Sequence, residues 1–496
     1  MLLPTILILF VPNSPHHLFK IHTFKLEDDE QNNPFASLGI VTDFLTRSST
    51  FNGGKQLHIP TCNNVEDSET KRQNLSTPEK IRIAGQQFID SYSLKADEVS
   101  ELITHPFAVS FSGLSDDETK DIQLLLTLLS SAEKAGKKLF NRAKKLLQLC
   151  SDISLSEGNP VERLVYYFSE AIRMKINSEI GKVALNGLES MQFDLQGALM
   201  NVDTCIFAFH QKVPLSQVCQ FSSFHTIIDN LYKSRKIHVI DLEIRTGMQY
   251  IVMMQSIASR SDCLIKHVKI TAIGTRSESK IKETCKRLAD VAKTMNIEFT
   301  FKVVMVADVL DFNIDLLELD ADEKVAVYAP FILSTLLVKP NRLEYLMREI
   351  RKINPCITVI TEVEANHTSP VFVDRFIDAL FFYGALFDSM SDCLSNDDLN
   401  RKVLESVFYG HCIRNIVAAE GDERTIRHIG VNVWRKFFQR FGMLEIKLSD
   451  ATLNEANLLI DNFKCGDSCS LLVDGSCFIV GWKSVPIFTV SAWKFI

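Results

Sequence analysis

The 496-residue sequence lacks an excess of positive charge and lacks long apolar runs. Its 54 Lys and Arg residues are outnumbered by 61 Asp and Glu residues, which gives a net charge of -7. Holding nucleic acid by bulk electrostatics requires concentrated Lys and Arg, so we expect contact with DNA to be weak or indirect. No stretch approaches the roughly 20 consecutive apolar residues that a transmembrane helix needs, and we therefore expect no association with a membrane.

The cysteines lack the spacing of a metal site. Twelve cysteines are scattered along the chain, and the closest set, Cys465, Cys469 and Cys477, has no matching pair of His or Cys residues at zinc-ligand spacing. We interpret them as buried free thiols in a reducing compartment, and we expect no bound metal. The apolar residues 1–12 also lack the basic flank of a secretory signal, so a signal peptide is disfavoured.

The turn after the first predicted strand lacks the glycines of a nucleotide site. Residues 237–242 read as a strand buried on both faces, and Gly247 opens the next helix. A backbone that approaches a phosphate or a carboxylate closely needs glycine in this turn, but Glu243 and Arg245 stand there. A later strand that ends at Gly274 lacks the acidic residue that would hold ribose hydroxyls. We infer that charged side chains close the cofactor position, and we expect no cofactor and no catalytic residue.

The first quarter of the chain and the part that follows it differ in composition. Residues 11–112 are rich in Ser, Asn, Thr, Asp and Pro, and we expect them to be largely disordered. Ordered pattern begins at Ser115, which forms a capping-box sequence with Glu118. Helical patterns then dominate to about residue 234. An apolar stripe follows the first of these helices through Leu139, Leu146 and Leu149.

From about residue 237, strands alternate with helical patterns such as 276–295 and 340–353. This alternation predicts an α/β fold with a doubly wound, mostly parallel, Rossmann-like sheet. The end of the chain breaks the alternation and predicts a terminal antiparallel hairpin, which together with five parallel strands is the layout of a class I methyltransferase sheet. The predicted strands are 237–242, 268–273, 299–304, 324–328, 356–360, 443–449, 477–483 and 487–495. An S-adenosylmethionine-dependent methyltransferase, or a small-molecule-binding protein on the same fold, therefore stays open as the alternative function.

Three motifs make the chain resemble the GRAS family of plant regulators, over roughly residues 115–496. The sequence IHVID at 237–241 resembles the family's VHIID core, with leucine-rich regions at about 115–235 and 250–312. Residues 353–390 resemble the PFYRE region, and residues 480–495 resemble the SAW region. In these two regions Pro355 matches the proline, Phe382 and Tyr383 match the aromatic pair, and Trp482 and Trp493 match the tryptophans.

The resemblance implies a methyltransferase-like core under an α-helical cap. By it we divide the chain into a variable, largely disordered region at 1–114, a helical cap and leucine-rich region at 115–235, and an α/β core at 236–496. The resemblance implies a diverged member outside the DELLA branch, because the stretch 207–226 departs from the pattern and 97–102 is a poor imitation of a DELLA segment.

The resemblance also implies a function without catalysis. GRAS proteins are transcriptional regulators that act in the nucleus through protein partners, which are commonly other GRAS proteins, as homodimers or heterodimers, and DNA-bound zinc-finger factors. A sheet fold without its cofactor site retains large faces for such recognition. We therefore expect a nuclear scaffold or co-regulator that meets DNA through its partners.

The residues that could carry recognition each have a plainer explanation. His238 and Asp241 fall on opposite sides of the strand alternation, so structural hydrogen bonds are favoured over a catalytic pair. The three tryptophans are candidate binding anchors, although packing against the sheet explains them at least as well. The tryptophans are Trp434, Trp482 and Trp493.

Two kinds of helical surface pattern remain. Arg435, Lys436 and Arg440 beside Trp434 give a basic, aromatic-studded helix, which is either a solvated face or a surface that contacts phosphates. Two leucine triplets have LxxLL spacing, and we favour a place in the core for both. A second basic run comprises Lys137, Lys138, Arg142, Lys144 and Lys145, and the triplets are Leu125, Leu128 and Leu129, and Leu333, Leu336 and Leu337.

Overall fold

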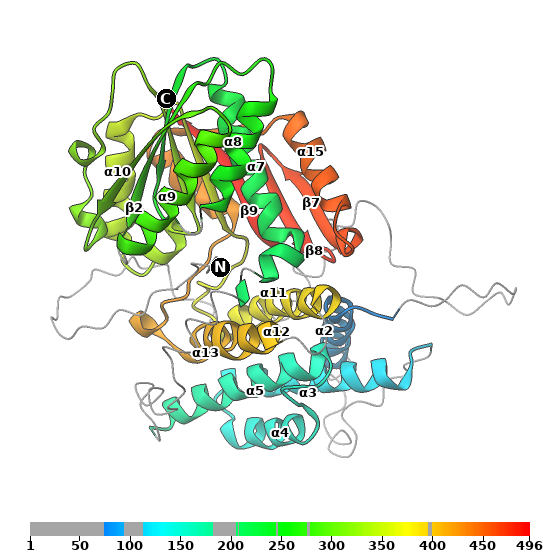
Figure 1. The fold of residues 1–496 in the computed structure, drawn as a ribbon. Helices are drawn as coiled ribbons and strands as arrows, with labels where there is room; N and C mark the ends of the chain where they lie inside the picture. Colours follow the sequence, from blue (N-terminus) through cyan, green and yellow to red (C-terminus); the bar gives the residue numbers. More distant parts are fainter. Residues whose placement is uncertain are drawn as a thin grey trace, which may run out of the picture.

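The structure is a computed structural model of the chain, and it describes residues 74–93, 113–181, 205–206, 208–244, 247–274, 278–394 and 399–496. These residues form an α/β body and a layer of helices packed below it (Figure 1). We refer to the body as the core and to the helical layer as the cap.

The core contains one nine-stranded sheet with the order β3-β2-β1-β4-β5-β9-β8-β7, and β6 pairs with β9 beside this path. Strands β1 to β5 are parallel, while β6, β7, β8 and β9 pair antiparallel. The predicted Rossmann-like, methyltransferase-like sheet with a terminal antiparallel hairpin is therefore confirmed. The strands are β1 Lys236–Asp241, β2 His267–Gly274, β3 Glu298–Met305, β4 Lys324–Pro330, β5 Ile357–Val363, β6 Met443–Ile446, β7 Cys469–Asp474, β8 Cys477–Trp482 and β9 Val485–Phe495.

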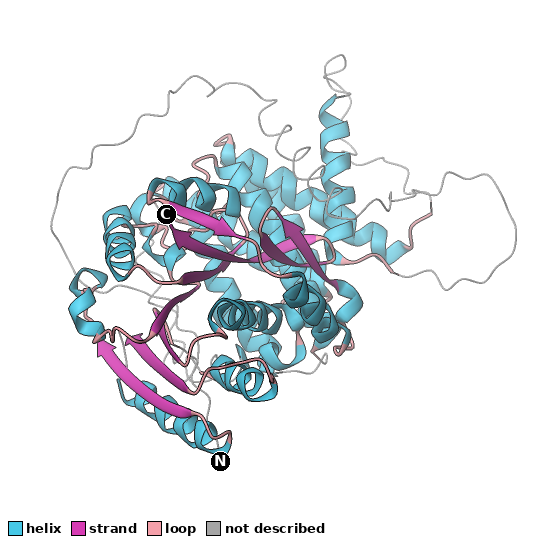
Figure 2. Cartoon of the chain, turned by 90° about the horizontal axis from the view of Figure 1, so that it is seen from above, coloured by secondary structure: helices cyan, strands magenta, loops and turns pink. Residues whose placement is uncertain are grey.

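Helices cover both faces of this sheet (Figure 2). Along β1, Ile237 and Val239 join the apolar cluster that contains α7 and α8 residues, whereas Ile240 joins the cluster that contains α10 and α14 residues. This alternation gives β1 its continuous apolar sequence, because both of its faces are buried. The helices of the core are α7 Pro214–Leu231, α8 Met248–Ser259, α9 Glu278–Thr294, α10 Pro340–Ile353, α14 Val431–Arg440 and α15 Asp450–Asp461. Short helical turns are η3 Val309–Asp311, η4 Ile314–Leu317, η5 Leu333–Leu336, η7 Gly421–Glu423 and η8 Gly466–Ser468.

The cap combines helices from distant parts of the sequence (Figure 1). The predicted capping box is present at the start of α3, where the Glu118 backbone N–H donates to Ser115 Oγ at 3.2 Å and the Ser115 N–H donates to Glu118 Oε2 at 2.9 Å. Leu125, Leu128 and Leu129 lie in the cap interior, as predicted for this triplet. The cap helices are α2 Thr77–Ser93, α3 Asp116–Gly136, α4 Phe140–Ile153, α5 Pro160–Glu179, α11 Phe372–Cys393, α12 Leu399–Val403, the π-helix η6 Leu404–Tyr409, and α13 Gly410–Ala418.

The predicted division of the chain differs from this arrangement in two ways. The cap includes α11 to α13, which follow β5 in sequence, whereas α7 packs on β5 and β9 and so belongs to the core. Helix α2 lies within the region predicted to be largely disordered, and that prediction is wrong for it. Ile81, Ala84 and Phe88, spaced on one helical face, are buried against the cap and explain why this short segment orders. Residues 1–73 and 94–112 lie outside the described part of the chain.

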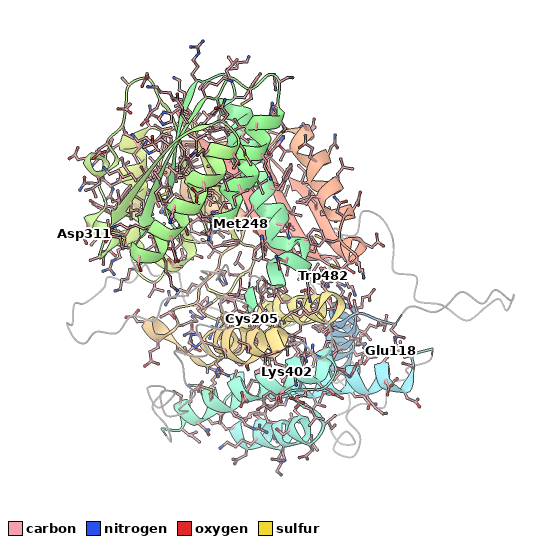
Figure 3. All side chains as sticks on the ribbon, viewed as in Figure 1. Glu118, Cys205, Met248, Asp311, Lys402 and Trp482 are labelled. Atoms are coloured by element: carbon pink, nitrogen blue, oxygen red, sulfur yellow. The ribbon has the colours of Figure 1, made fainter. Side chains whose placement is uncertain are left out.

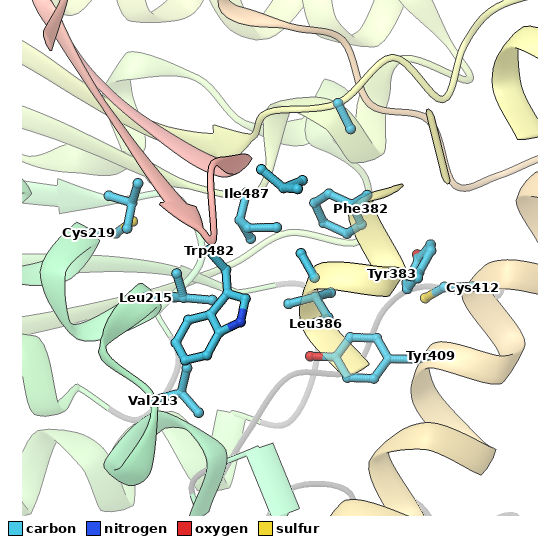
Figure 4. Close-up of a cluster of buried hydrophobic side chains, with 14 of the residues drawn as sticks. Val213, Leu215, Cys219, Phe382, Tyr383, Leu386, Tyr409, Cys412, Trp482 and Ile487 are labelled. Carbon is cyan, nitrogen blue, oxygen red and sulfur yellow. The ribbon is translucent and has the colours of Figure 1, made fainter. Parts of the chain in front are cut away.

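A buried carboxylate joins cap and core. Asp388 of α11 accepts hydrogen bonds from the Trp482 Nε1–H at 2.9 Å and from the Thr77 backbone N–H at 2.7 Å. Lys483 Nζ lies 3.0 Å from the same carboxylate. Trp482, at the end of β8, lies at the boundary between the two parts (Figure 3). Its indole packs among Val213, Leu215 and Leu386 (Figure 4).

Candidate functional site

The carboxyl end of β1 is where this topology would hold a ligand. The strand order reverses between β1 and β4, and open α/β sheets bind ligands outside the carboxyl ends of strands at such a switch point. Asp241, the last residue of β1, is fully buried there. Its Oδ2 accepts a hydrogen bond from the Tyr250 hydroxyl at 2.8 Å, and its Oδ1 accepts from the Glu243 backbone N–H at 3.0 Å.

Aromatic side chains fill this position. Phe224 of α7 packs edge-on against Tyr250 and Tyr328, with ring centroids 4.9 and 4.8 Å away, and all three side chains are at most 2% exposed. Burial, together with the Asp241 charge, raises the pKa of Tyr250 well above its ordinary value, so its hydroxyl remains a donor. We expected charged side chains to close this position, and that expectation stays a prediction. Glu243 is only half-buried, and Arg245 lies outside the described residues.

The glycine after β1 serves helix packing. Gly247 has φ +70 and precedes α8, and an added Cβ would lie 2.5 Å from Thr284 Cγ2 of α9. A side chain there would be strained by the backbone conformation and would clash with α9. The close approach that requires this glycine is therefore that of a neighbouring helix.

His238 lies on the other face of β1. Its Nδ1 is 2.6 Å from Glu323 Oε1 and its Nε2 is 2.7 Å from Thr271 Oγ1, and the side chain is fully buried. Burial lowers the pKa of His238, and the Glu323 charge opposes this shift. A neutral imidazole that donates from Nδ1 and accepts at Nε2 satisfies both contacts. His238 and Asp241 are thus held by separate partners on opposite faces, which agrees with the preferred structural interpretation.

The other motif residues support the fold. Phe382 and Tyr383 are 6% and 2% exposed in α11, and Pro355 is buried before β5. Trp493 is fully buried, donates from Nε1 to Ser491 Oγ at 2.9 Å and packs on Phe438, with ring centroids 4.8 Å apart. Because Trp482 is also fully buried, these side chains offer no surface to a partner in this conformation.

An apolar groove lies between α10 and α14. Its volume is about 350 Å³. Val433, which is 52% exposed, and the partly buried Phe437 line it from α14, and the buried Trp434 lies between them. Trp434 is only 3% exposed, so its ring packs beneath the groove and stacks on Phe438. The complete lining is Leu337, Pro340, Leu343, Glu344, Ile429, Val433, Trp434, Lys436, Phe437 and Arg440.

The charges on the rim of the groove are mostly positive. Lys436 and Arg440 are exposed, and the Arg440 guanidinium lies 5.3 Å from the centroid of the Phe437 ring. Glu344 is paired with Arg348 at 3.2 Å. Arg435 instead turns away to Glu445 and Asp474, at 3.0 and 3.2 Å. Of the residues predicted from this helix, Lys436 therefore borders the groove, whereas Arg435 ties α14 to the sheet.

The sequence did not predict the groove, because two segments that are distant in the chain form it. Its α14 wall was visible as a basic, aromatic-studded helix, but Leu337 and Pro340 come from nearly 100 residues earlier in the chain. Leu333 of the second leucine triplet is buried as predicted, but Leu336 and Leu337 are only half-buried, and Leu337 lines the groove. The amphipathic period of α10 and α14 was the available signal, and only the tertiary structure joins the two helices.

A second exposed apolar surface lies on α4. Leu149 and Ile153 are each 54% exposed and Leu139 is 41% exposed, so the predicted apolar stripe partly faces solvent. The lysines and arginine of the second basic run are also exposed. A second copy of α4 brought against this surface would place like charges together, which disfavours contact between two α4 faces.

The described residues contain neither a membrane span nor a metal site. No described helix is long and apolar enough to cross a membrane. No group of three or more His, Cys, Asp and Glu side chains in the described ranges is arranged to hold a metal ion.

Fold and site together define a methyltransferase-like α/β protein whose ligand position is filled with aromatic side chains. The GRAS domain family model matches residues 124–494, and the chain belongs to this family. The crystal structure of SCL7 from Oryza sativa is similar, with a TM-score of 0.68 and 25% sequence identity over 75% of this chain and 99% of that chain.

Two curated relatives have sequences similar to that of this chain. The DELLA protein GAI1 of Vitis vinifera is 28% identical over 385 residues, which cover 77% of this chain and 63% of that protein. DELLA protein 2 of Medicago truncatula is 27% identical over 440 residues, covering 88% and 79%. The chain thus spans less than two thirds of the length of the grapevine relative.

Proposed function

We propose that this protein is a nuclear co-regulator of transcription that works as a scaffold for other proteins. Its partners are other GRAS proteins, in homodimers or heterodimers, and DNA-binding factors such as zinc-finger proteins, and its own contact with DNA is indirect or weak. The observation that carries the proposal is the contrast between a ligand position filled by Phe224, Tyr250 and Tyr328 and an open apolar groove on α14.

The chemistry of the groove favours one kind of partner segment. An amphipathic helix places apolar side chains at positions i, i+3, i+4 and i+7, and such a stripe fits an apolar groove. Lys436 and Arg440 on the rim attract acidic residues at the edges of that stripe. We therefore assign the groove to an acidic amphipathic helix of a partner protein.

The partner proposal is tested by charge reversal. The double variant Lys436→Glu, Arg440→Glu is compared with a matched pair of exposed lysines on α9, changed as Lys286→Glu, Lys293→Glu. We expect the groove variant to weaken binding of GRAS or zinc-finger partners at least about tenfold, with the α9 variant unchanged. Equal binding by both variants would remove the groove from the proposal.

The alternative function is a methyltransferase or small-molecule binder, and a ligand titration separates it from the scaffold. A ligand that binds only the native state must raise its apparent stability. We expect S-adenosylmethionine to leave the thermal midpoint of the purified chain unchanged, because aromatic side chains occupy its position. A dose-dependent rise in that midpoint would favour the alternative.

A further inference from the structure

Two chain segments connect the core to the cap helices α11 to α13, and they lie against each other. Residues 364–371 lead from β5 to α11, and residues 419–430 lead from α13 back to α14. Both run between the core and the cap (Figure 1). The His367 backbone N–H donates to the His428 carbonyl oxygen at 3.0 Å. We refer to 364–371 as the first crossing and to 419–430 as the second crossing.

A serine that precedes a proline lies in the first crossing. Ser369 is half-buried, and the Pro370 that follows it is exposed. The sequence has two other hydroxyl residues before proline, Ser14 and Thr77. Ser14 lies outside the described residues, and Thr77 is only 3% exposed. Within the described ranges, Ser369 is therefore the hydroxyl before proline that an enzyme can reach.

Buried arginines bind the backbone of this serine. Arg375 Nη1 donates to the Ser369 carbonyl oxygen at 2.7 Å, and Arg424 Nη1 donates to the same oxygen at 3.2 Å. Arg375 is fully buried, and Arg424 is 7% exposed. Arg427 of the second crossing donates from Nε to the Arg424 carbonyl oxygen at 2.9 Å. Three arginines therefore gather where the two crossings meet.

The positive charge of these arginines is incompletely balanced. The Glu420 carboxylate lies 2.7 Å from Arg375 Nη2 and 2.9 Å from Lys175 Nζ, so one carboxylate serves two cations. In the part of the chain that the structure describes, no carboxylate is paired with Arg424, and its Nε is buried without a hydrogen-bond partner. Burial and the charge of Arg375 lower the pKa of Arg424 to about 10. Because a buried charge without a counter-ion is costly, an anion beside Arg424 would be stabilising.

We propose that Ser369 is a phosphorylation site whose phosphate group is bound by Arg424. A protein kinase transfers the γ-phosphoryl group of ATP to Ser369 Oγ. The new bond joins Oγ to phosphorus, the bond from that phosphorus to the β-phosphate oxygen breaks to leave ADP, and the hydroxyl proton is released. A phosphoserine carries a charge of about −1.5 to −2 at neutral pH and three acceptor oxygens. It therefore supplies Arg424 with a counter-ion and with acceptors for its free N–H groups.

The groups around Ser369 Oγ include one carboxyl group and one helix terminus. Oγ lies 3.5 Å from Asp374 Oδ2 and accepts from the Val371 backbone N–H at 3.3 Å. Burial raises the pKa of Asp374 to about 6, and a neighbouring phosphate would raise it further, so this carboxyl group takes up a proton readily. Val371 is the N-cap of α11, where the helix dipole favours an anion.

The phosphate would join the two crossings. Ser369 belongs to the first crossing and Arg424 to the second, so their ion pair would add to the backbone hydrogen bond between His367 and His428. A phosphate held by an arginine from another segment fixes the two segments together. The phosphorylated protein would therefore hold the cap more firmly on the core and resist unfolding more strongly.

Phosphorylation of the purified full chain tests the proposal. The chain is treated with a proline-directed protein kinase and ATP, and its phosphopeptides are mapped by mass spectrometry. We expect phosphate on Ser369 and none on the buried Thr77. We also expect a thermal midpoint raised by several degrees, which a phosphatase reverses. A folded chain that stays unmodified at Ser369, or a phosphorylated chain with an unchanged or lower midpoint, would overturn the proposal.

Three variants provide the controls. Ser369→Ala should show no rise in midpoint after kinase treatment, and a rise in this variant would assign the effect to another residue. Arg424→Gln should still be phosphorylated but should lose most of the rise, while its untreated midpoint reports folding. Arg348→Gln changes an exposed arginine of α10 and should keep the full rise. A full rise in Arg424→Gln would show that this arginine does not bind the phosphate.

Discussion

The carboxyl end of β1 and the groove on α14 are two regions of one core, and they differ in how far their side chains are exposed to solvent. At β1, Tyr250 donates to Asp241 and Phe224 seals the space, so every group is buried and paired. At α14, Val433 and Phe437 remain accessible beside unbonded cations on the rim. The difference teaches that the position where this topology would hold a ligand is packed with buried side chains that stabilise the core, whereas the groove leaves apolar side chains open to solvent.

The largest change is expected from emptying the filled region. Tyr250→Ala removes a fully buried ring and leaves Asp241 without its hydroxyl donor, and we expect the free energy of unfolding to fall by about 4 kcal/mol. Tyr250→Phe keeps the ring and should cost about 1 to 2 kcal/mol, the cost of one buried hydrogen bond. Denaturant unfolding measures both. A loss below about 1 kcal/mol for Tyr250→Ala would mean that the ring does not support the core.

A smaller loss of stability is expected on the other face of β1, at His238. Thr271→Val removes the donor to His238 Nε2, and we expect a loss of about 1 to 2 kcal/mol, because a buried acceptor is left unpaired. The variant is nearly isosteric, so packing changes little. Chemical unfolding at neutral pH measures the loss, and an unchanged midpoint would show that the imidazole does not need this bond.

The pH dependence of stability sharpens the assignment of His238. Its folded-state pKa is lowered by burial, so below about pH 6.5 the unfolded imidazole binds a proton that the folded one resists. The free energy of unfolding should therefore decrease as the pH falls from about 6.5 towards the folded-state pKa. His238→Gln cannot titrate and should show a shallower decrease over that range. Parallel pH profiles would contradict a neutral buried imidazole.

The smallest effect on stability, with the largest expected effect on binding, belongs to the groove. Val433→Asp places a charge on an exposed position of α14, and we expect a change in unfolding free energy within about 0.5 kcal/mol. Partner affinity should fall about tenfold or more, because the acidic partner helix loses an apolar contact and meets a like charge. Val252→Asp, at a 40% exposed valine of α8, is the matched control. Equal binding by the two variants would contradict the proposal that the partner binds in the groove.

Local patterns predicted much of the core. Alternating or continuous apolar residues predicted strands β1 to β5 and the final hairpin. The side chains of Ser115 and Glu118 predicted the capping box. Helix α2 was not predicted, and its order depends on burial of Ile81 and Phe88 against helices from distant parts of the sequence. Strand β7 was not predicted, because its residues are mostly half-buried and it is an edge strand that pairs only with β8.

The site was less predictable than the fold. The turn after β1 predicted an altered ligand position, but it did not predict the aromatic side chains there, which come partly from Phe224, a residue that precedes β1 in sequence. Trp482 and Trp493 were recognisable as motif residues, yet their burial could be known only from the packing of β8 and β9. Side chains supplied by distant segments have no local signature, so neither the filled region nor the groove could be assembled from sequence alone.

The Asp388 junction has a consequence for biosynthesis. The carboxylate accepts from Thr77, 311 residues earlier, and from Trp482, 94 residues later. Residues 388 and 482 must therefore both emerge from the ribosome before the amino end of α2 gains its acceptor and that acceptor gains its indole donor. Contacts between remote residues form slowly, so this junction is complete only after residue 482 has been synthesised. A chaperone that shields Ile81 and Phe88 in the nascent chain would act during that interval.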